Sequence, residues 1–517
     1  MQTQVLIIGG GCTGTGLARD LALRGIDCML VEQRDINAGA SGGNHGLLHS
    51  GARYVSNDPH SAVECQAEAE LLKQLAPQCI EETGGLFIAV QGDDENYVSD
   101  FQTYCDREGI WYRSLELQEA AELEPKLSPK LIGAYAVRDA TVDPFQLSLE
   151  NMAQAMDLGS RYLNRHRVVG MQTGSGRVQT VQIQNVLSGE YLEIQAGIVV
   201  NATGAWAGQI AALAGIALEM HYSKGTLLVA HNRLTGRVIN RLRPPSDGDI
   251  LVPGGTVSIM GTTSVQLPDL KDIRPTRPEA QEMVKQGAAM LPGLHTARFT
   301  RAYAGVRPLL QSDDAEGRAV SRGFALIDHA RDGLENLMTV TGGKLTTFRL
   351  MAEKAADLAA QKLGLSTVCR TRTEALPETP VNKWTEGGRS SRAWLRAGDA
   401  ADHIVCECEM VPKSHFVQVL DDLQSHQAET PDLDQLRRRT RLGKGACQGA
   451  FCSVRVTGVR YDQGTLEGDQ GCRQVKDFLQ ARWAGQLPIL WGAQLAQAEL
   501  SEGIHCAVFG LEMEQDA

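Results

Sequence analysis

The sequence predicts an α/β fold in which a domain built on a parallel sheet is interleaved with a mixed β-sheet domain and followed by a small, mostly helical C-terminal domain. A strand–turn–helix–strand pattern opens the chain over residues 4–32. Short strand patterns broken by Pro and Gly fill residues 220–330, as is typical of a second sheet. Two close cysteine pairs lie between residues 406 and 452 and mark a separate module.

The composition is that of a globular protein of several domains. With 517 residues, and domains of about 150 residues each, two to four domains are expected. An apolar fraction of 43% and a charged fraction of 22% exclude wholesale disorder. The net charge of −12 argues against a nucleic-acid binder, because such proteins need an excess of cations to displace counterions from phosphates.

The first strand–helix–strand unit consists of a strand over 4–8, a helix over 15–24 and a strand over 28–31. Leu17, Ala18, Leu21 and Ala22 fall on one face of that helix, and Gly25 stands where a left-handed helix stop is expected. Further helices are predicted over 61–75 and 345–363. Residues 177–186 and 191–195 predict a hairpin around a turn at 187–190, and buried strands are predicted over 198–200 and 337–340.

Gly9, Gly11 and Gly14 form a G-x-G-x-x-G fingerprint between the first strand and its helix, and Glu32 ends the next strand. The first glycine permits a tight turn, the second lets the backbone approach a pyrophosphate, and the third lets helix and strand pack closely. The helix N-terminus favours the phosphates, and Glu32 can accept hydrogen bonds from an adenosine ribose. This Rossmann-like unit therefore predicts dinucleotide binding. Its place at the N-terminus, with the Ala-Thr-Gly turn at 202–204 and the Gly-rich turn at 342–346, favours FAD over NAD.

Three blocks resemble the FAD-dependent glycerol-3-phosphate dehydrogenases of the D-amino-acid-oxidase-like flavoprotein fold. They are GASGGNHGLLHSGARY at 39–54, AGVRPL at 304–309 and TGGKLTTFR at 341–349. The chain is most similar to the large subunits of the anaerobic enzymes, which also carry a C-terminal cysteine module. The resemblance implies oxidation of sn-glycerol 3-phosphate to dihydroxyacetone phosphate by hydride transfer to flavin N5, with electrons passed to partner subunits and quinone.

The blocks supply the candidate site residues. Arg53, Arg307 and Lys344 are candidate cations for the substrate phosphate, since Arg suits bidentate phosphate contacts and Lys a point charge. His49 is the first candidate for the catalytic base and His45 the second, because an imidazole titrates near neutral pH. Either histidine could instead hydrogen-bond the flavin or fix the loop. Besides the fingerprint residues and Glu32, the predicted FAD contacts are Gln33, Ala40, Ser41, Gly46, Leu48, Gly204, Gly342, Gly343, Leu345 and Thr346.

The C-terminal module contains Cys406-x-Cys408 and Cys447-x4-Cys452, separated by 38 residues. Four thiolates in two close pairs can hold zinc or an iron–sulfur cluster. The one-residue gap fits structural zinc poorly, because zinc sites favour gaps of two to four. The arrangement resembles the [2Fe–2S] module of bacterioferritin-associated ferredoxin, which implies a [2Fe–2S] cluster. The run Arg437-Arg438-Arg439-Thr440-Arg441 could neutralise that cluster, dock a partner or form a solvated helix face.

The expected organisation is an oxidoreductase unit over 1–364, a linker over 365–401, the cysteine module over 402–460 and a tail over 461–517. Within the first unit, FAD-binding segments are expected at about 1–75, 145–215 and 325–364, and substrate-domain segments at about 76–144 and 216–324. The charge-free stretch at 196–218 contains Asn201, Thr203 and Gln209 and is interpreted as a strand, a turn and a small helix, not a membrane span.

The favoured interpretation is a cytoplasmic, quinone-linked dehydrogenase chain held at the inner face of the cell membrane by partner subunits. It is expected to form a hetero-oligomer and to bind no nucleic acid. Two alternatives stay open. One is a dehydrogenase of the same fold acting on a 2-hydroxy acid or an amino-acid derivative, whose carboxylate Arg53 and Arg307 could clamp. The other is a flavin and iron–sulfur relay protein with no substrate of its own.

Overall fold

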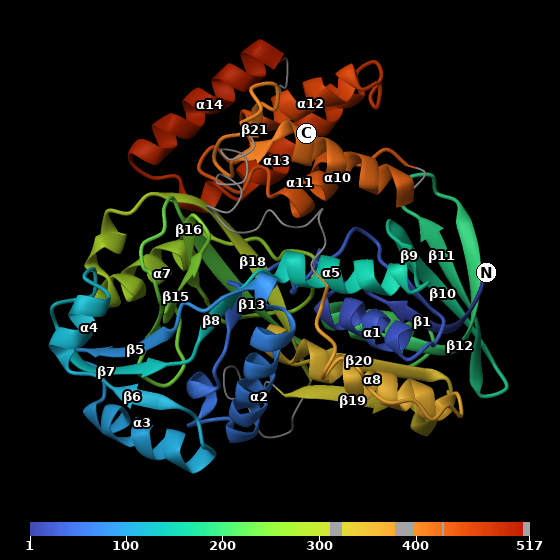
Figure 1. The fold of residues 1–517 in the computed structure, drawn as a ribbon, viewed down its shortest axis with the longest axis horizontal. Coiled ribbons are helices and arrows are strands. Elements are labelled where there is room, and N and C mark those ends of the chain that lie inside the picture. Colours follow the sequence, from blue (N-terminus) through green and yellow to red (C-terminus); the bar gives the residue numbers. More distant parts are fainter. Residues whose placement is uncertain (311–322, 378–397, 427–428, 510–517) are drawn as a thin grey trace.

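The computed structural model describes residues 1–310, 323–377, 398–426 and 429–509 and has the expected α/β architecture, with two large sheets below a helical C-terminal module (Figure 1). The first sheet has the strand order β10-β11-β12-β1-β2-β9, with β20 paired to β12 and β19 to β20. Its strands are β1 (Gln2–Ile8), β2 (Cys28–Val31), β9 (Arg161–Leu163), β10 (His166–Gly174), β11 (Arg177–Asn185), β12 (Tyr191–Asn201), β19 (Phe324–Asp328) and β20 (Leu337–Gly342).

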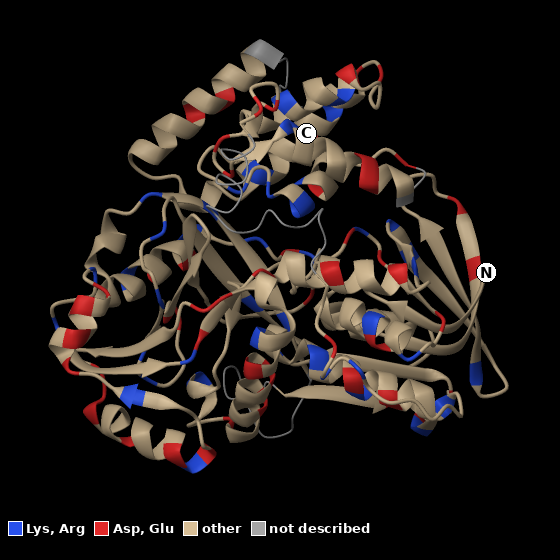
Figure 2. Ribbon diagram, viewed as in Figure 1, with Lys and Arg blue, Asp and Glu red and all other residues tan. Residues whose placement is uncertain are grey.

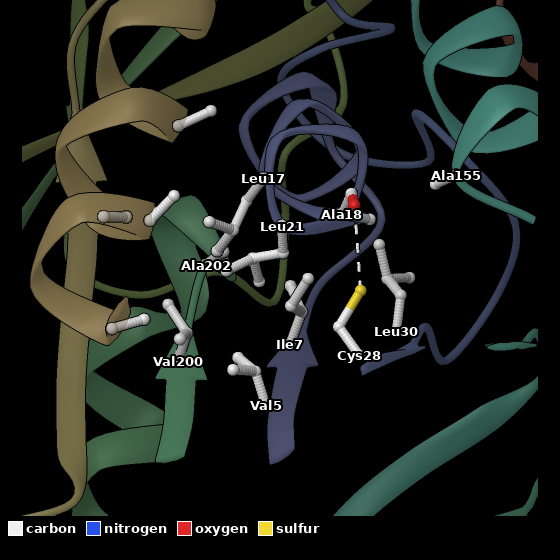
Figure 3. Close-up of a cluster of buried hydrophobic side chains, with 14 of the residues drawn as sticks. Val5, Ile7, Leu17, Ala18, Leu21, Cys28, Leu30, Ala155, Val200 and Ala202 are labelled. Atoms are coloured by element: carbon white, nitrogen blue, oxygen red, sulfur yellow. Dashed lines mark hydrogen bonds between the residues drawn. The ribbon is translucent and has the colours of Figure 1, made fainter. Parts of the chain in front are cut away.

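The core of this sheet is the predicted opening unit. β1 pairs in parallel with β2 and β12. Helix α1 (Cys12–Leu23) covers them between α5 (Pro144–Asp157) and α8 (Phe348–Lys362). Leu17 and Leu21 point from α1 toward Val5 and Ile7 of β1 (Figure 3) and are fully buried. Gly25 follows the helix with a φ of +74°, which confirms the predicted left-handed stop.

Two predicted boundaries in this domain are wrong. Helix α1 begins at Cys12, not at 15, because Gly11 already serves as its N-cap. The predicted hairpin forms between β11 and β12, but residues 198–200 belong to the same continuous strand as Tyr191. That strand can be long because its first half pairs with β11 and its second half with β1 and β20.

The second sheet forms the mixed-sheet domain, with the order β17-β13-β16-β15-β14-β5-β7-β6 and with β18 paired to β13. Helix α7 (Arg277–Met290) packs on it around a core that includes Leu228 and Met283. The strands are β5 (Gly85–Val90), β6 (Tyr112–Ser114), β7 (Leu131–Val137), β13 (Met220–Ala230), β14 (Val238–Arg241), β15 (Ile250–Gly254), β16 (Val257–Gly261), β17 (Val265–Leu267) and β18 (Phe299–Leu310).

Short elements join the two sheets. A small sheet has the order β3-β8-β4, formed by β3 (Leu47–Leu48), β8 (Ala140–Val142) and β4 (Ile80–Glu81). Helix α2 (Pro59–Leu75) runs beside it. Three further helices are α3 (Glu95–Glu108), α4 (Leu117–Leu123), which packs on β7, and α6 (Ala207–Ala212), which packs on β12 and β20. Among the described residues, the structure contains no helix long and apolar enough to cross a membrane.

The C-terminal module contains a two-stranded sheet and a group of packed helices. Its elements are β21 (Ile404–Cys406), β22 (Val411–Pro412), α10 (Lys413–His426), α11 (Leu433–Thr440), α12 (Cys452–Asp462), α13 (Gln470–Ala484) and α14 (Ala493–Phe509). Phe416 and Leu436 share one buried core with Phe478 and Leu479 of α13. The predicted end at residue 460 therefore falls inside α12, and the packed module continues into the expected tail. Residues 510–517 of that tail lie outside the described residues.

The first part of the expected linker packs on the body. The Leu376 amide donates to the Leu75 carbonyl at 2.7 Å, and Arg19 donates to the Glu374 carbonyl at 2.8 Å. Residues 378–397 of the linker lie outside the described residues.

The module docks on the body through α11, whose basic residues stand at the boundary between the two (Figure 2). Arg439 forms a buried ion pair with Asp35 at 2.7 Å, and Arg438 donates to the Ile36 carbonyl at 3.0 Å. Arg165 of the body pairs with Asp432 at 2.6 Å. The arginine run is therefore not a solvated helix face. It attaches the module next to the loop that follows Glu32.

Replacing Gly14 by alanine should destabilise the protein. A Cβ atom at this position would lie 2.0 Å from the Gly9 carbonyl oxygen, so helix α1 would have to move off the turn. Such overpacking costs about 1–3 kcal/mol, and the thermal unfolding midpoint should fall. Gly293→Ala is the matched control, because nothing lies within 4 Å of its added Cβ. Equal midpoints for the two variants would contradict the packing described here.

Candidate functional site

The candidate site is a cavity of about 460 Å³ where the fingerprint turn, the loop at 38–49 and the strands of the second sheet meet. His49, Arg53, Arg307 and Lys344 all line it. These four side chains come from three distant parts of the chain. The structure therefore brings together the residues that the sequence singled out for substrate chemistry.

The predicted FAD contacts fall into two groups. Most line this cavity: Gly9, Gly11, Glu32, Gln33, Ala40, Ser41, Gly204, Gly342, Gly343 and Leu345. The others lie around it. Gly14 packs against the Gly9 carbonyl of the fingerprint turn. Gly46 lines a second cavity, and Leu48 and Thr346 are buried. The Thr346 hydroxyl accepts from the His49 amide at 3.2 Å, which makes Thr346 a positioning residue for the base candidate.

The dinucleotide end of the cavity is built from backbone amides and one carboxylate. Glu32 accepts from the Gly10 amide at 2.8 Å and from the Arg34 amide at 2.9 Å. Burial raises the pKa of Glu32, while these two amides partly offset that rise. The Cys12 amide, at the start of α1, donates to the Ser41 hydroxyl at 3.0 Å, so Ser41 joins the loop to the helix N-terminus. This glycine-lined cradle with a carboxylate at its edge fits FAD.

The loop at 38–49 contacts the second sheet through the backbones of Gly43 and Gly305. A Cβ atom on Gly305 of β18 would lie 2.2 Å from the Gly43 carbonyl oxygen, so only glycine permits this approach. Arg307, two residues further along β18, faces the cavity from the same strand. It donates to Ser223 Oγ at 3.2 Å and to the Thr263 carbonyl at 3.1 Å, and also to Thr262 Oγ1.

The other two cations differ in their surroundings. Arg53 pairs with the buried carboxylate of Asp249 at 3.2 Å, yet its Nη1 atom is buried with no hydrogen-bond partner among the described residues. Lys344 Nζ donates to Ser61 Oγ at 2.8 Å and lies 4.7 Å from the centroid of the Tyr54 ring. A buried guanidinium nitrogen without an acceptor is costly unless an anion binds beside it.

The two histidines have different roles in the loop. His49 Nε2 lies 3.3 Å from the Tyr54 hydroxyl, and the two rings meet edge to face. His45 Nδ1 accepts from the Leu47 amide at 3.3 Å, so this imidazole helps to fix the loop. Tyr54, Ser61 and Asp249 were not singled out from the sequence. Tyr54 could have been found from the sequence, because it directly follows Arg53 in the first block. Ser61 and Asp249 lie outside the three blocks, so no motif indicated them.

The four cysteines of the module are also brought together. Cys408 Sγ lies 3.8 Å from Cys447 Sγ, and Cys452 is close enough to Cys406 and Cys447 to interact with both electrostatically. A Cβ atom on Gly445 would lie 2.2 Å from Cys408 Cβ, so this glycine lets the two cysteine loops meet. Within the described ranges, however, no group of three or more His, Cys, Asp or Glu side chains is arranged to hold a metal ion.

Comparisons with known proteins agree with this geometry. The family model "FAD dependent oxidoreductase" matches residues 4–358. The chain is 42% identical to one of the subunits of the anaerobic glycerol-3-phosphate dehydrogenase of Escherichia coli, covering 99% of this chain and 98% of that protein. It is 40% identical to the corresponding protein of Haemophilus influenzae, covering 99% of this chain and 94% of that one.

Solved structures show the same fold. The glycerol-3-phosphate dehydrogenase of Bacillus halodurans, complexed with FAD, superposes with a TM-score of 0.66 at 21% identity and covers 95% of this chain and 96% of its own. The L-alpha-glycerophosphate oxidase of Mycoplasma pneumoniae superposes with a TM-score of 0.59 at 17% identity and covers 73% of this chain and all of its own. The family model matches more than half of the chain, and the sequence is 42% identical to a relative over nearly its full length. With the glycine cradle, these matches show that the chain belongs to the FAD dependent oxidoreductase family and is related to these anaerobic glycerol-3-phosphate dehydrogenase subunits.

Proposed function

We propose that this chain oxidises sn-glycerol 3-phosphate to dihydroxyacetone phosphate. The observation that carries the proposal is that the three candidate cations and the candidate base His49 line a single cavity that also contains the dinucleotide cradle. A small polyol phosphate needs fixed cations for its dianion and a proton acceptor for its hydroxyl. The names of the full-length relatives point to the same substrate.

Each of the three cations would contribute differently to binding the substrate phosphate. Arg53 Nη1 lacks an acceptor among the described residues, so a phosphate oxygen would satisfy a buried donor that is otherwise orphaned. Arg307 donates to the Ser223 hydroxyl on β13 and to the Thr263 carbonyl between β16 and β17, and these contacts preorganise its guanidinium. Lys344 lies between Tyr54 and Ser61 and adds a point charge.

His49 is proposed as the base that accepts the proton of the substrate hydroxyl. The Tyr54 hydroxyl and Thr346 set the position of its ring and backbone. His49 is 8% exposed, so water is largely excluded from the imidazole. FAD, when bound in the cradle, supplies the acceptor for the hydride of the secondary carbinol.

We further propose that Cys406, Cys408, Cys447 and Cys452 hold a [2Fe–2S] cluster. The chemistry of the donor set supports this group, because two loops of the module bring four thiols to one region and place the Cys408 and Cys447 sulfurs 3.8 Å apart. Such a cluster supplies one-electron transfer beside a two-electron flavin. Zinc stays the less favoured occupant because of the one-residue gap in the first pair.

The two bacterial relatives are each named as one subunit of their enzyme, which supports partner chains for this protein as well. We propose that these partners carry electrons on to membrane quinone and hold the chain at the inner face of the membrane. This would make the enzyme a quinone-linked dehydrogenase.

Lys344→Gln should lower kcat/KM for glycerol 3-phosphate by about 10- to 100-fold, because a hydrogen bond to a charged group is worth about 1.5–3 kcal/mol. The rate of flavin bleaching by substrate under anaerobic conditions measures this. Arg274→Gln removes one charge from an exposed pair with Asp272 and serves as control. A Lys344→Gln enzyme as active as the control would contradict the proposed phosphate site.

Cys408→Ser should abolish visible iron–sulfur absorbance and lower iron and sulfide content, while bleaching of the flavin by substrate continues. The reason is that a thiolate ligand is lost from the module and the flavin cavity is untouched. Cys472→Ser is the matched control, because that thiol is exposed. Iron and sulfide contents that are equal in the two variants, or absent from the unmodified protein, would rule out the cluster.

A further inference from the structure

A second cavity of about 470 Å³ lies on the other side of the loop at 38–45 from the candidate active site. The two cavities share Ala38, Gly39, Gly43, Asn44 and His45 as a common wall. Tyr303 donates to the Asn44 carbonyl at 2.7 Å and supports that wall from the second cavity. Residues of the module line this cavity together with residues of the body, so it lies between the two.

Cations dominate the lining of the second cavity. Six of them, from β18, the α11 region and α13, are Arg301, Arg437, Arg438, Arg441, Lys444 and Arg482. Arg233 is the seventh and pairs with Glu81 at 2.6 Å. The acids lining the cavity are Glu81 and Asp143. Asp434 and Glu409 do not line the cavity but pair with two of the lining cations, Arg438 and Lys444. Counting these two carboxylates as well, the seven cations outnumber the four carboxylates by three.

Three of these guanidinium groups each have a nitrogen without an acceptor in the described part of the chain, although Arg441 pairs with Asp143 at 3.2 Å and Arg482 donates to Gln448 at 2.7 Å through other nitrogens. The Nε atoms of Arg301, Arg441 and Arg482 are buried with no hydrogen-bond partner among the described residues. Arg482 is only 4% exposed. Arg301 forms no ion pair within the described ranges, and burial together with the nearby Arg437 lowers its pKa to about 10. Buried guanidinium nitrogens without an acceptor are costly, and a bound anion would remove that cost.

We propose that this second cavity binds a small organic phosphate, separately from the substrate. Guanidinium groups approach from three elements, and a phosphate monoester offers three terminal oxygens to accept from several directions. A carboxylate has only two oxygens, and one guanidinium group can bind both of them. Several guanidinium groups around one cavity therefore favour a phosphate over a carboxylate. Phe145, Val229 and Ile259 add an apolar wall that suits the organic part of such a ligand. None of the cations proposed for the substrate phosphate lines this cavity.

Equilibrium dialysis of labelled inorganic phosphate against the FAD-loaded full-length protein, at constant ionic strength, tests the site. Arg301→Gln should weaken one class of phosphate sites about tenfold or more, whereas Lys344→Gln should leave that class intact. Arg274→Gln controls for the change in net charge. Arg301 is partly exposed, and retained flavin absorbance verifies that its variant folds.

Two further outcomes decide the proposal. Arg301→Lys, which keeps the charge but loses the fork, should bind phosphate with intermediate affinity. If Arg301→Gln binds phosphate as the unmodified protein does, or if Lys344→Gln abolishes all phosphate binding, the second site does not exist. Because the two variants affect different cavities, failure of this proposal is distinguishable from failure of the proposed substrate site.

Discussion

Close contact between backbone segments is the constraint on which the site depends. Gly14 lets helix α1 sit on the carbonyl of Gly9, and Gly305 lets β18 touch Gly43. These contacts draw the first turn, the loop at 38–49 and the second sheet around one cavity. Any side chain at these positions would separate the dinucleotide cradle from the cations that face it. The shape of this cavity therefore depends on glycine at positions 14 and 305.

The same principle extends to the C-terminal module. Gly445 allows the second cysteine loop to reach Cys408, and α11 attaches the module to the segment that follows Glu32. The module thus packs beside the loop that lines both cavities. The cluster proposed for its thiols would therefore belong to a module that packs directly on the part of the chain that contains the dinucleotide cradle.

The local parts of the fold could be predicted from the sequence, and the long-range contacts could not. Strand Cys28–Val31, the stop at Gly25 and the hairpin of β11 and β12 follow from periodicity and turn residues within a short window. The arginine run was ambiguous, because its partners Asp35 and Asp143 lie hundreds of residues away. Asp249 was missed for the same reason, because it lies far along the chain from its partner Arg53. Tyr54 lies next to Arg53 in the sequence, but its contact with His49 depends on the folded loop. His49 and the cations were singled out by family resemblance, and only the structure shows them around one cavity.

The most direct test of this account is an anaerobic titration of the purified chain with glycerol 3-phosphate, and in parallel with a 2-hydroxy acid, followed by flavin absorbance. The account predicts bleaching by glycerol 3-phosphate and none by the 2-hydroxy acid, because it assigns the three cations to a phosphate dianion. Bleaching by the 2-hydroxy acid alone, or by neither compound, would contradict it.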